Sequence, residues 1–185
     1  MADSYGFSLD EWFERLKQMP VPEGYKVEIV EGAITMSPQR DVRWEIIRRI
    51  VRELEDRFGM DVRVLSDVRI DFGEQNGFAP DVVKLAAGAK KDIRGRWLPR
   101  DIEFVAQVIS KGTAASDYGP KKLAYAAAAV PVYLIVDPYT GQCLIHSEPK
   151  DGTYHKQVSM DFGLDIDLTG TVVDLTLRTD WFPRD

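Results

Sequence analysis

The segment Phe78-Ala79-Pro80-Asp81-Val82-Val83 is followed, after a basic stretch, by Phe104-Val105-Ala106-Gln107-Val108-Ile109-Ser110. Both segments are apolar runs of strand length, and the second indicates a central strand that is buried on both faces. Pro80 is tolerated at the start of the first strand, because that residue need not donate to the ladder. If the two strands are neighbours and the side chains of Asp81 and Gln107 leave the same face, the two polar groups converge.

The residues before this pair predict a helix, a hairpin and a second helix. Ser8 with Glu11 fits a capping box, and apolar residues at helical spacing predict a helix over residues 9–18. Residues 25–36 alternate around a glycine turn, which predicts a β-hairpin. Residues 62–72 predict one long strand that returns as residues 79–85.

The clearest helix is predicted over residues 41–58, with Gly59 at its C-cap. The apolar residues that step by three and four along it are Trp44, Ile47, Val51, Leu54 and Phe58. Its remaining face carries arginines and glutamates, so the apolar stripe is expected to face the core.

The residues after the pair predict one more helix and several strands. Residues 116–129 are rich in alanine and lysine and predict a helix, in which Pro120 is tolerated only in the first turn. Residues 132–136 predict a buried strand, and residues 141–185 predict short strands joined by glycine turns. We therefore expect one α/β (or α+β) domain over residues 1–185. Its core spans about 25–140, its mixed β-sheet is flanked by helices, and its C-terminal extension is β-rich.

The bulk composition bounds the class of protein. A hydrophobic fraction of 44% with 29% charged residues is typical of a globular domain with a real core. The single cysteine, Cys143, excludes an internal disulfide framework and a multi-cysteine zinc site. The N-terminus Met1-Ala2-Asp3-Ser4 lacks the features of a signal peptide, and the longest apolar run is short of the roughly 20 residues of a membrane span. We expect a cytoplasmic protein without membrane contact.

The charge is unevenly distributed. A net charge of −6 argues against binding nucleic acid over the whole surface. The segment from 84 to 100 nevertheless carries six basic residues against one acid, namely Lys84, Lys90, Lys91, Arg94, Arg96 and Arg100. This segment indicates either a phosphate-bearing partner or an ordinary solvated loop.

The two polar residues on the strands have oxygen atoms that suit a magnesium site. Mg²⁺ takes oxygen ligands, usually one or two carboxylates with water and substrate phosphate. A bound metal activates water for phosphodiester hydrolysis, and a nearby lysine stabilises the transition state. Gln107 offers a carbonyl oxygen but not the negative charge of a carboxylate, and Glu28 or Glu103 could compensate for it. The alternative for Gln107 is a buried glutamine satisfied by hydrogen bonds in a decayed site.

Four short motifs occur in an order and spacing that resemble a known family. They are Pro80-Asp81, the run 105–110, the helix 117–126 and the run 130–138. In this order they resemble the Uma-two family, a bacterial group of restriction-endonuclease-like proteins in the PD-(D/E)XK nuclease superfamily. The hairpin followed by Ser37-Pro38 is also similar to the N-terminal signature of that family. The resemblance covers residues 25–140 and implies a restriction-endonuclease-like fold.

The resemblance also implies roles for particular residues. Asp81 would be the metal-binding aspartate, and Gln107 would occupy the slot of the second metal-binding acid. Ile109 stands where the usual nuclease lysine is found, so that lysine would have moved to Lys121, flanked by Asp117 and Tyr125. The chain departs from the pattern at Gln107 and in lacking the histidine after Ser37-Pro38, where Arg43 and Trp44 lie.

The expected function is a metal-dependent DNA endonuclease in which Asp81 and Gln107 bind Mg²⁺ or Mn²⁺ weakly and Lys121 assists, with Tyr125 as an accessory residue. DNA is expected to contact Lys90, Lys91, Arg94 and Arg96. A homodimer is plausible, because a monomeric nuclease of this size cuts one strand per encounter. The alternatives are an impaired nuclease fold that serves as a DNA-binding or protein-interaction module, and a hydrolase for another phosphorylated substrate.

Overall fold

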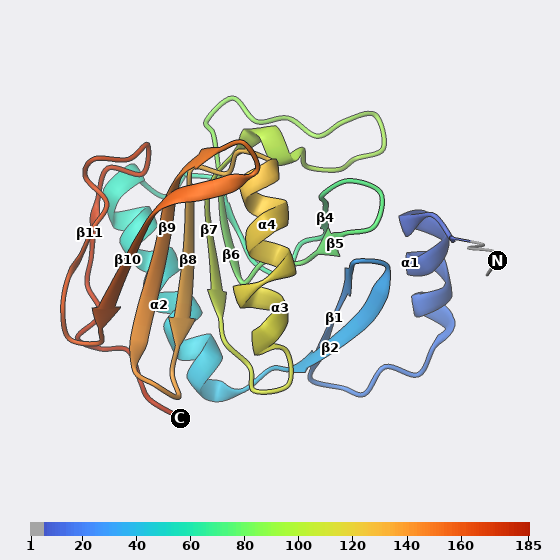
Figure 1. Ribbon diagram of the computed structural model, residues 1–185, viewed down its shortest axis with the longest axis horizontal. Helices are drawn as coiled ribbons and strands as arrows, with labels where there is room; N and C mark the ends of the chain where they lie inside the picture. Colours follow the sequence, from blue (N-terminus) through green and yellow to red (C-terminus); the bar gives the residue numbers. More distant parts are fainter. Residues whose placement is uncertain (1–5) are drawn as a thin grey trace.

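A six-stranded mixed sheet runs through the computed structural model, which describes residues 6–185. Its strand order is β10-β9-β8-β7-β6-β3, and only β7 and β8 are parallel (Figure 1). The strands are β3 (Val64–Leu65), β6 (Val82–Leu85), β7 (Ile102–Val108), β8 (Val132–Asp137), β9 (Gln142–Lys150) and β10 (Thr153–Asp161). This sheet confirms the predicted mixed α/β architecture.

Each face of the large sheet is covered by its own layer (Figure 1). On one face lies α2 (Asp41–Phe58), together with the C-terminal segment that pairs β11 (Ile166–Asp167) with β12 (Thr176–Leu177). On the other lie α3 (Ala114–Tyr118) and α4 (Pro120–Ala127). Two apolar cores result, one on each side of β7.

A smaller, four-stranded sheet stands beside the large one, in the order β2-β1-β5-β4. It consists of the hairpin β1 (Tyr25–Val30) and β2 (Ala33–Pro38) with the short strands β4 (Ile70–Asp71) and β5 (Gly77–Phe78). The helix α1 (Leu9–Gln18) packs Leu9 and Leu16 against Ile29 of this sheet. The capping box at Ser8 is present as predicted.

The long strand predicted over residues 62–72 is wrong. The structure has two strands of two residues there, and they belong to different sheets: β3 pairs with β6, and β4 pairs with β5. Asp67 lies between them with a φ of 55°, a left-handed conformation that ends any regular strand. The alternation of apolar residues continues across this break because both pieces face a core.

The helix predicted over residues 116–129 is divided in two. Gly119 has φ −115° and ψ −99°, and Pro120 is the first residue of α4. The missing amide hydrogen of a proline costs nothing in the first turn of a helix, so the chain restarts there. The basic segment after β6 is irregular and ends in the short 3₁₀ helix η1 (Pro99–Asp101).

The part of the chain that the structure describes has no helix long and apolar enough to cross a membrane. The first five residues, which the sequence predicts to carry no signal peptide, lie outside the described part.

Candidate functional site

The neighbouring antiparallel strands β6 and β7 place Asp81 and Gln107 on the same side of the large sheet. Val82 is paired with Ala106, and both pack in the core beneath α2. The side chains next to them along the strands point the other way, towards α3 and α4. Asp81 and Gln107 are both on that side, and both are buried, with 0% and 1% of their surface exposed.

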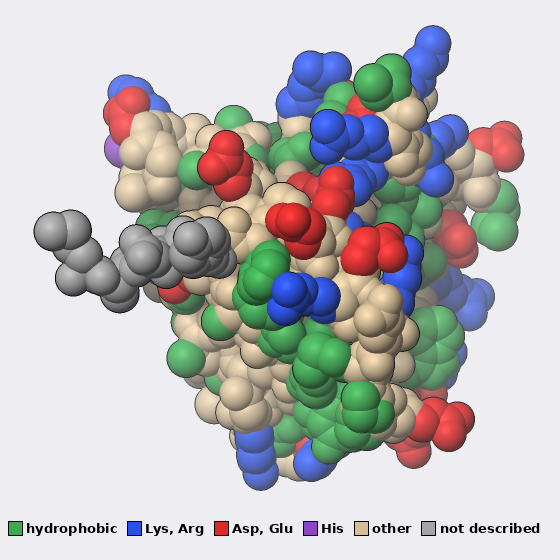
Figure 2. Space-filling view, turned by 90° about the vertical axis from the view of Figure 1, so that its right-hand side faces the viewer, with side chains coloured by type: hydrophobic (Ala, Val, Ile, Leu, Met, Phe, Trp, Pro, Cys, Tyr) green, Lys and Arg blue, Asp and Glu red, His purple; other side chains and the backbone are tan. Residues whose placement is uncertain are grey.

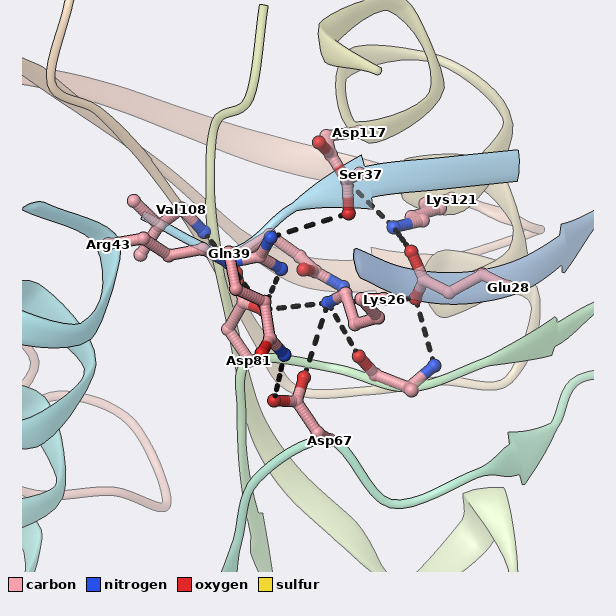
Figure 3. A network of polar contacts seen from close by, with 12 residues as sticks. Lys26, Glu28, Ser37, Gln39, Arg43, Asp67, Asp81, Val108, Asp117 and Lys121 are labelled. Atoms are coloured by element: carbon pink, nitrogen blue, oxygen red, sulfur yellow. Dashed lines mark hydrogen bonds and ion pairs between the residues drawn. The ribbon is translucent and has the colours of Figure 1, made fainter. Parts of the chain in front are cut away.

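Three residues donate hydrogen bonds to the carboxylate of Asp81 (Figure 3). Its Oδ1 accepts a hydrogen bond of 2.7 Å from Lys26 Nζ and bonds from Nε and Nη2 of Arg43, the former of 3.1 Å. Its Oδ2 accepts the backbone amide of Val108 at 2.8 Å. The side chain of Asp81 therefore pairs with two cations and also ties the end of β7 to β6.

These contacts fix the ionisation of Asp81. Burial alone would raise the pKa of its carboxyl, but Lys26 and Arg43 outweigh burial and lower the pKa to about 2. Asp81 in turn raises the pKa of the Arg43 guanidinium, against the opposing effect of burial. The group is an ionised carboxylate at neutral pH.

A second set of ion pairs continues the network. Glu28 accepts the amide of Ala79 through Oε1 at 2.8 Å and pairs through Oε2 with Lys121 Nζ at 2.6 Å. Lys121 Nζ also lies 2.9 Å from Asp117 Oδ1, in an ion pair without hydrogen-bond geometry. Burial raises the pKa of Asp117, whereas Asp117 and Glu28 hold the pKa of Lys121 above its usual value despite burial.

The side-chain amide of Gln107 is hydrogen-bonded to a neighbouring tyrosine. Its Nε2 donates to the hydroxyl of Tyr125 at 3.1 Å, and Tyr125 is fully buried. Burial and the nearby Glu28 raise the pKa of the Tyr125 hydroxyl well above its usual value, so this group stays protonated. Asp81, Gln107, Lys121, Glu28 and Tyr125 thus lie in one cluster.

The cluster as it stands does not fit a divalent cation. Three buried carboxylates, of Glu28, Asp81 and Asp117, face three buried cations, of Lys26, Arg43 and Lys121. The more exposed Asp67 adds a fourth carboxylate 3.6 Å from Lys26, which leaves a formal charge of only −1. None of the six buried residues exposes more than 7% of its surface. Among residues 6–185, no group of three His, Cys, Asp or Glu side chains is arranged to hold a metal ion.

Lys26 and Arg43 are the two partners of Asp81 in this cluster that sequence reasoning does not identify. Arg43 sits on the buried face of α2, in register with Ile46, Ile47 and Ile50, whereas Trp44, predicted to face the core, is 60% exposed. A charged residue at a core position of a helix is the signal that could have found it. Lys26 shares a strand face with Glu28, two residues along β1.

Other predicted site residues lie elsewhere. Glu103 is at the start of β7, where it pairs with Lys84, and Asp81 and Gln107 are at the other end of the two strands. The basic segment connects β6 to β7 at that same far end. Because β6 has four residues at about 3.3 Å each, the two ends are separated by about 13 Å. The basic segment therefore does not line the cluster around Asp81.

The four basic residues expected to contact DNA differ in their surroundings. Arg96 is held by Asp10 and by Asp71, the latter at 2.8 Å, so its charge is neutralised within the protein. Lys90, Lys91 and Arg94 are exposed, and Arg94 lies 3.8 Å from Asp10 in a longer ion pair. Figure 2 shows Lys and Arg side chains gathered at the upper edge of the face that carries α1 and the smaller sheet.

Comparisons with known proteins give a family and a fold. The model of the Uma2 family, described as "Putative restriction endonuclease", matches residues 13–180. The crystal structure of a "putative nuclease belonging to DUF820" from Anabaena variabilis ATCC 29413 is similar at 15% identity with a TM-score of 0.71, and the similarity covers 94% of this chain and 96% of that chain. The cryo-EM structure of a DrdV–DNA complex aligns at 12% identity with a TM-score of 0.30, over 64% of this chain and 12% of that chain, which is too low to indicate a shared fold. No curated protein matches.

Proposed function

The chain belongs to the Uma2 family of restriction-endonuclease-like proteins, and on this premise we propose that it is a DNA-binding member whose hydrolytic centre is closed. In this proposal Lys26 and Arg43 take the place that a metal ion would fill beside Asp81. The exposed basic residues of the segment between β6 and β7 bind the DNA backbone.

The observation that carries the proposal is the double cationic pairing of the Asp81 carboxylate. A divalent cation at Asp81 would have to displace Lys26 and Arg43, and both would then lose their nearest carboxylate inside the protein. Breaking a buried ion pair in this way costs about 3–5 kcal/mol. Gln107 offers no negative charge in return, because its side chain is an amide.

The burial of Asp81 is a second argument for a closed hydrolytic centre. A phosphodiester must touch the catalytic groups to be cleaved, and Asp81 has no exposed surface. The segment that carries the basic residues available to a phosphate leaves β6 at its far end, about 13 Å along the strand from Asp81. The residues proposed to bind DNA are therefore separated from the buried cluster, as expected of a protein that binds DNA without cutting it.

The second candidate is the Mg²⁺- or Mn²⁺-dependent endonuclease, with Asp81 and Gln107 as metal ligands and Lys121 as the assisting lysine. The observation that favours it is the convergence of Asp81, Glu28 and Lys121 in a single cluster of a nuclease-family fold. It requires Lys26 and Arg43 to withdraw from Asp81.

A cleavage assay on supercoiled plasmid with Mg²⁺ or Mn²⁺ separates the two candidates. We expect the wild type to nick no faster than Asp81→Ala, and calorimetric titration with millimolar Mg²⁺ to give no saturable heat. Robust cleavage by the wild type that Asp81→Ala abolishes would instead establish the endonuclease.

DNA binding is tested separately, by fluorescence anisotropy with a labelled duplex. Replacing Lys90, Lys91 and Arg94 by Gln should weaken binding and reduce the magnitude of the slope of log K against log salt by about 2.7, if each base neutralises one phosphate. A matched control replaces three exposed bases elsewhere, Lys17, Arg52 and Lys150, with the same change in net charge. Equal losses for both triple variants would contradict a role for the basic segment.

A further inference from the structure

The side chain of Ile93 projects fully into solvent from the basic segment. Its exposed fraction, 104%, is the largest of the exposed large apolar residues in the described part of the chain. A single exposed apolar residue is ordinary on a protein surface. The meaning of Ile93 therefore depends on how it is held and on what surrounds it.

The turn that carries Ile93 is fixed by its own hydrogen bonds. The amide of Asp92 donates to the carbonyl of Arg96 at 2.8 Å, and the amide of Gly95 donates to the carbonyl of Asp92 at 3.0 Å. Asp92 Oδ1 accepts the amides of Arg94 at 2.8 Å and Arg96 at 2.9 Å. Gly95 has a φ of 75°, which a glycine adopts without strain. The turn thus presents Ile93 at its tip without using the Ile93 side chain in any of these bonds.

The base of the turn is anchored to the rest of the protein. Arg96 pairs with Asp10 and Asp71, which belong to α1 and β4. Trp97 is buried, with the guanidinium of Arg63 4.8 Å and Nζ of Lys91 5.3 Å from its ring centre. A protruding tip on a rigid base loses little conformational entropy when it binds a partner.

The surroundings of the tip are positively charged. Lys90 and Lys91 precede Ile93, Arg94 follows it, and all three are exposed. The acid in the turn, Asp92, directs its carboxylate towards backbone amides. In Figure 2 apolar and basic side chains are mixed at the upper edge of this face.

We propose that Ile93 is an apolar wedge that enters between adjacent base pairs of duplex DNA, while Lys90, Lys91 and Arg94 contact the flanking phosphates. The inference rests on the proposed DNA binding and adds the mode of contact. DNA-bending proteins insert apolar side chains of this size between base steps, and lysine and arginine are attracted to the negative potential of the minor groove. A single apolar side chain buries too little surface to anchor a protein stably to a bilayer, which favours DNA over a lipid surface.

The test uses a duplex with 2-aminopurine at its central step and donor and acceptor dyes at its ends. The wild type should raise the 2-aminopurine fluorescence, which reports unstacking, and shorten the distance between the dyes. Ile93→Ala should bind about tenfold more weakly and lose both signals, whereas Ile93→Leu should keep them. The matched control Leu164→Ala removes an apolar side chain that is 53% exposed on the C-terminal segment, and it should behave as the wild type.

The outcomes separate the wedge from DNA binding itself. If the wild type binds the duplex with a dependence on Lys90, Lys91 and Arg94, but Ile93→Ala changes neither affinity nor fluorescence, the wedge is wrong and the proposed function stands. If the wild type binds no duplex, both are wrong. Binding to vesicles of anionic phospholipid that Ile93→Ala abolishes, without duplex binding, would assign the tip to a membrane surface instead.

Discussion

Replacing Asp81 by Asn should destabilise the protein in the absence of any metal ion. The substitution keeps the shape of the side chain and an oxygen that can accept the amide of Val108, but it removes the negative charge. Lys26 and Arg43 are then left buried without their shared carboxylate. The sign of the stability change is therefore a direct test of whether the centre is closed.

The magnitude follows from the ionisation of Asp81. Its pKa of about 2 lies nearly two units below the ordinary value of 3.8, which corresponds to about 2.5 kcal/mol of stability at neutral pH. Loss of one partner from a buried ion pair costs about 3–5 kcal/mol. We expect a loss of about 3 kcal/mol, or a fall in Tm of about 6–12 °C for a chain of this length.

The assay is urea unfolding of the wild type and Asp81→Asn in buffer with a chelator, at several pH values. Because the pKa of Asp81 is lowered in the folded protein, its contribution is complete above pH 3.8 and is lost as the pH falls towards 2. The difference between the two proteins should therefore shrink as the pH falls from 3.8 towards 2. The control Asp56→Asn changes an exposed aspartate and should alter the free energy of unfolding by no more than about 0.5 kcal/mol.

The opposite result would refute the reasoning. In a centre whose carboxylates repel one another until a metal arrives, neutralising one of them relieves that repulsion. Asp81→Asn would then be as stable as the metal-free wild type, or more stable. Stabilisation of the wild type by Mg²⁺ that Asp81→Asn abolishes would contradict the closed centre in the same way.

Three further changes have defined outcomes. Combining Arg43→Ala with Gln107→Glu makes the formal charge of the cluster more negative by two units, and calorimetry should detect Mn²⁺ binding that the wild type lacks; no binding would show that charge alone does not exclude the metal. Lys121→Met leaves Glu28 and a second buried carboxylate without their cation and should cost about 3 kcal/mol in urea unfolding, whereas no loss would mean that the pairs are not formed. His146 is buried, and burial lowers its pKa to about 4. The free energy of unfolding should therefore fall by up to about 3 kcal/mol as the pH drops from 6.5 to 4, and His146→Phe should remove this dependence. A variant with the same pH profile as the wild type would contradict this role of His146.

The sequence predicts the regular elements well where local signals agree with the core. The capping box before residue 9 and the glycine after residue 58 mark helices that the structure contains, and the apolar run from Ile102 is the central strand. Over residues 62–72 the prediction is wrong, because alternating apolar residues indicate burial but do not show that a strand is continuous. Only the pairing partners of β3 and β4, which are far apart in the sequence, show that the two pieces belong to different sheets.

The candidate site could be predicted only in part. The motifs locate Asp81, Gln107 and Lys121, and the structure brings these residues together. The partners of Asp81 come from a strand and a helix more than 35 positions earlier, so no local pattern connects them. The separation of the basic segment from Asp81 follows from the direction of the strands. Asp81 precedes β6, whereas the basic segment follows β6, so the two lie at opposite ends of this strand although they are close in sequence.

The ion-pair network also joins the two sheets. Lys26 and Glu28 belong to the smaller sheet, whereas Arg43 and Lys121 come from helices packed on the large one, and Asp81 immediately precedes β6. Because the pairs are buried, salt screens them little, and the smaller sheet cannot detach without uncovering several charges at once. Amide hydrogen exchange should therefore place β1 in the same cooperative unit as β7. Access to Asp81 would have to come from a rare opening of that whole unit, so the burial of this carboxylate is a property of the architecture rather than of a single side chain.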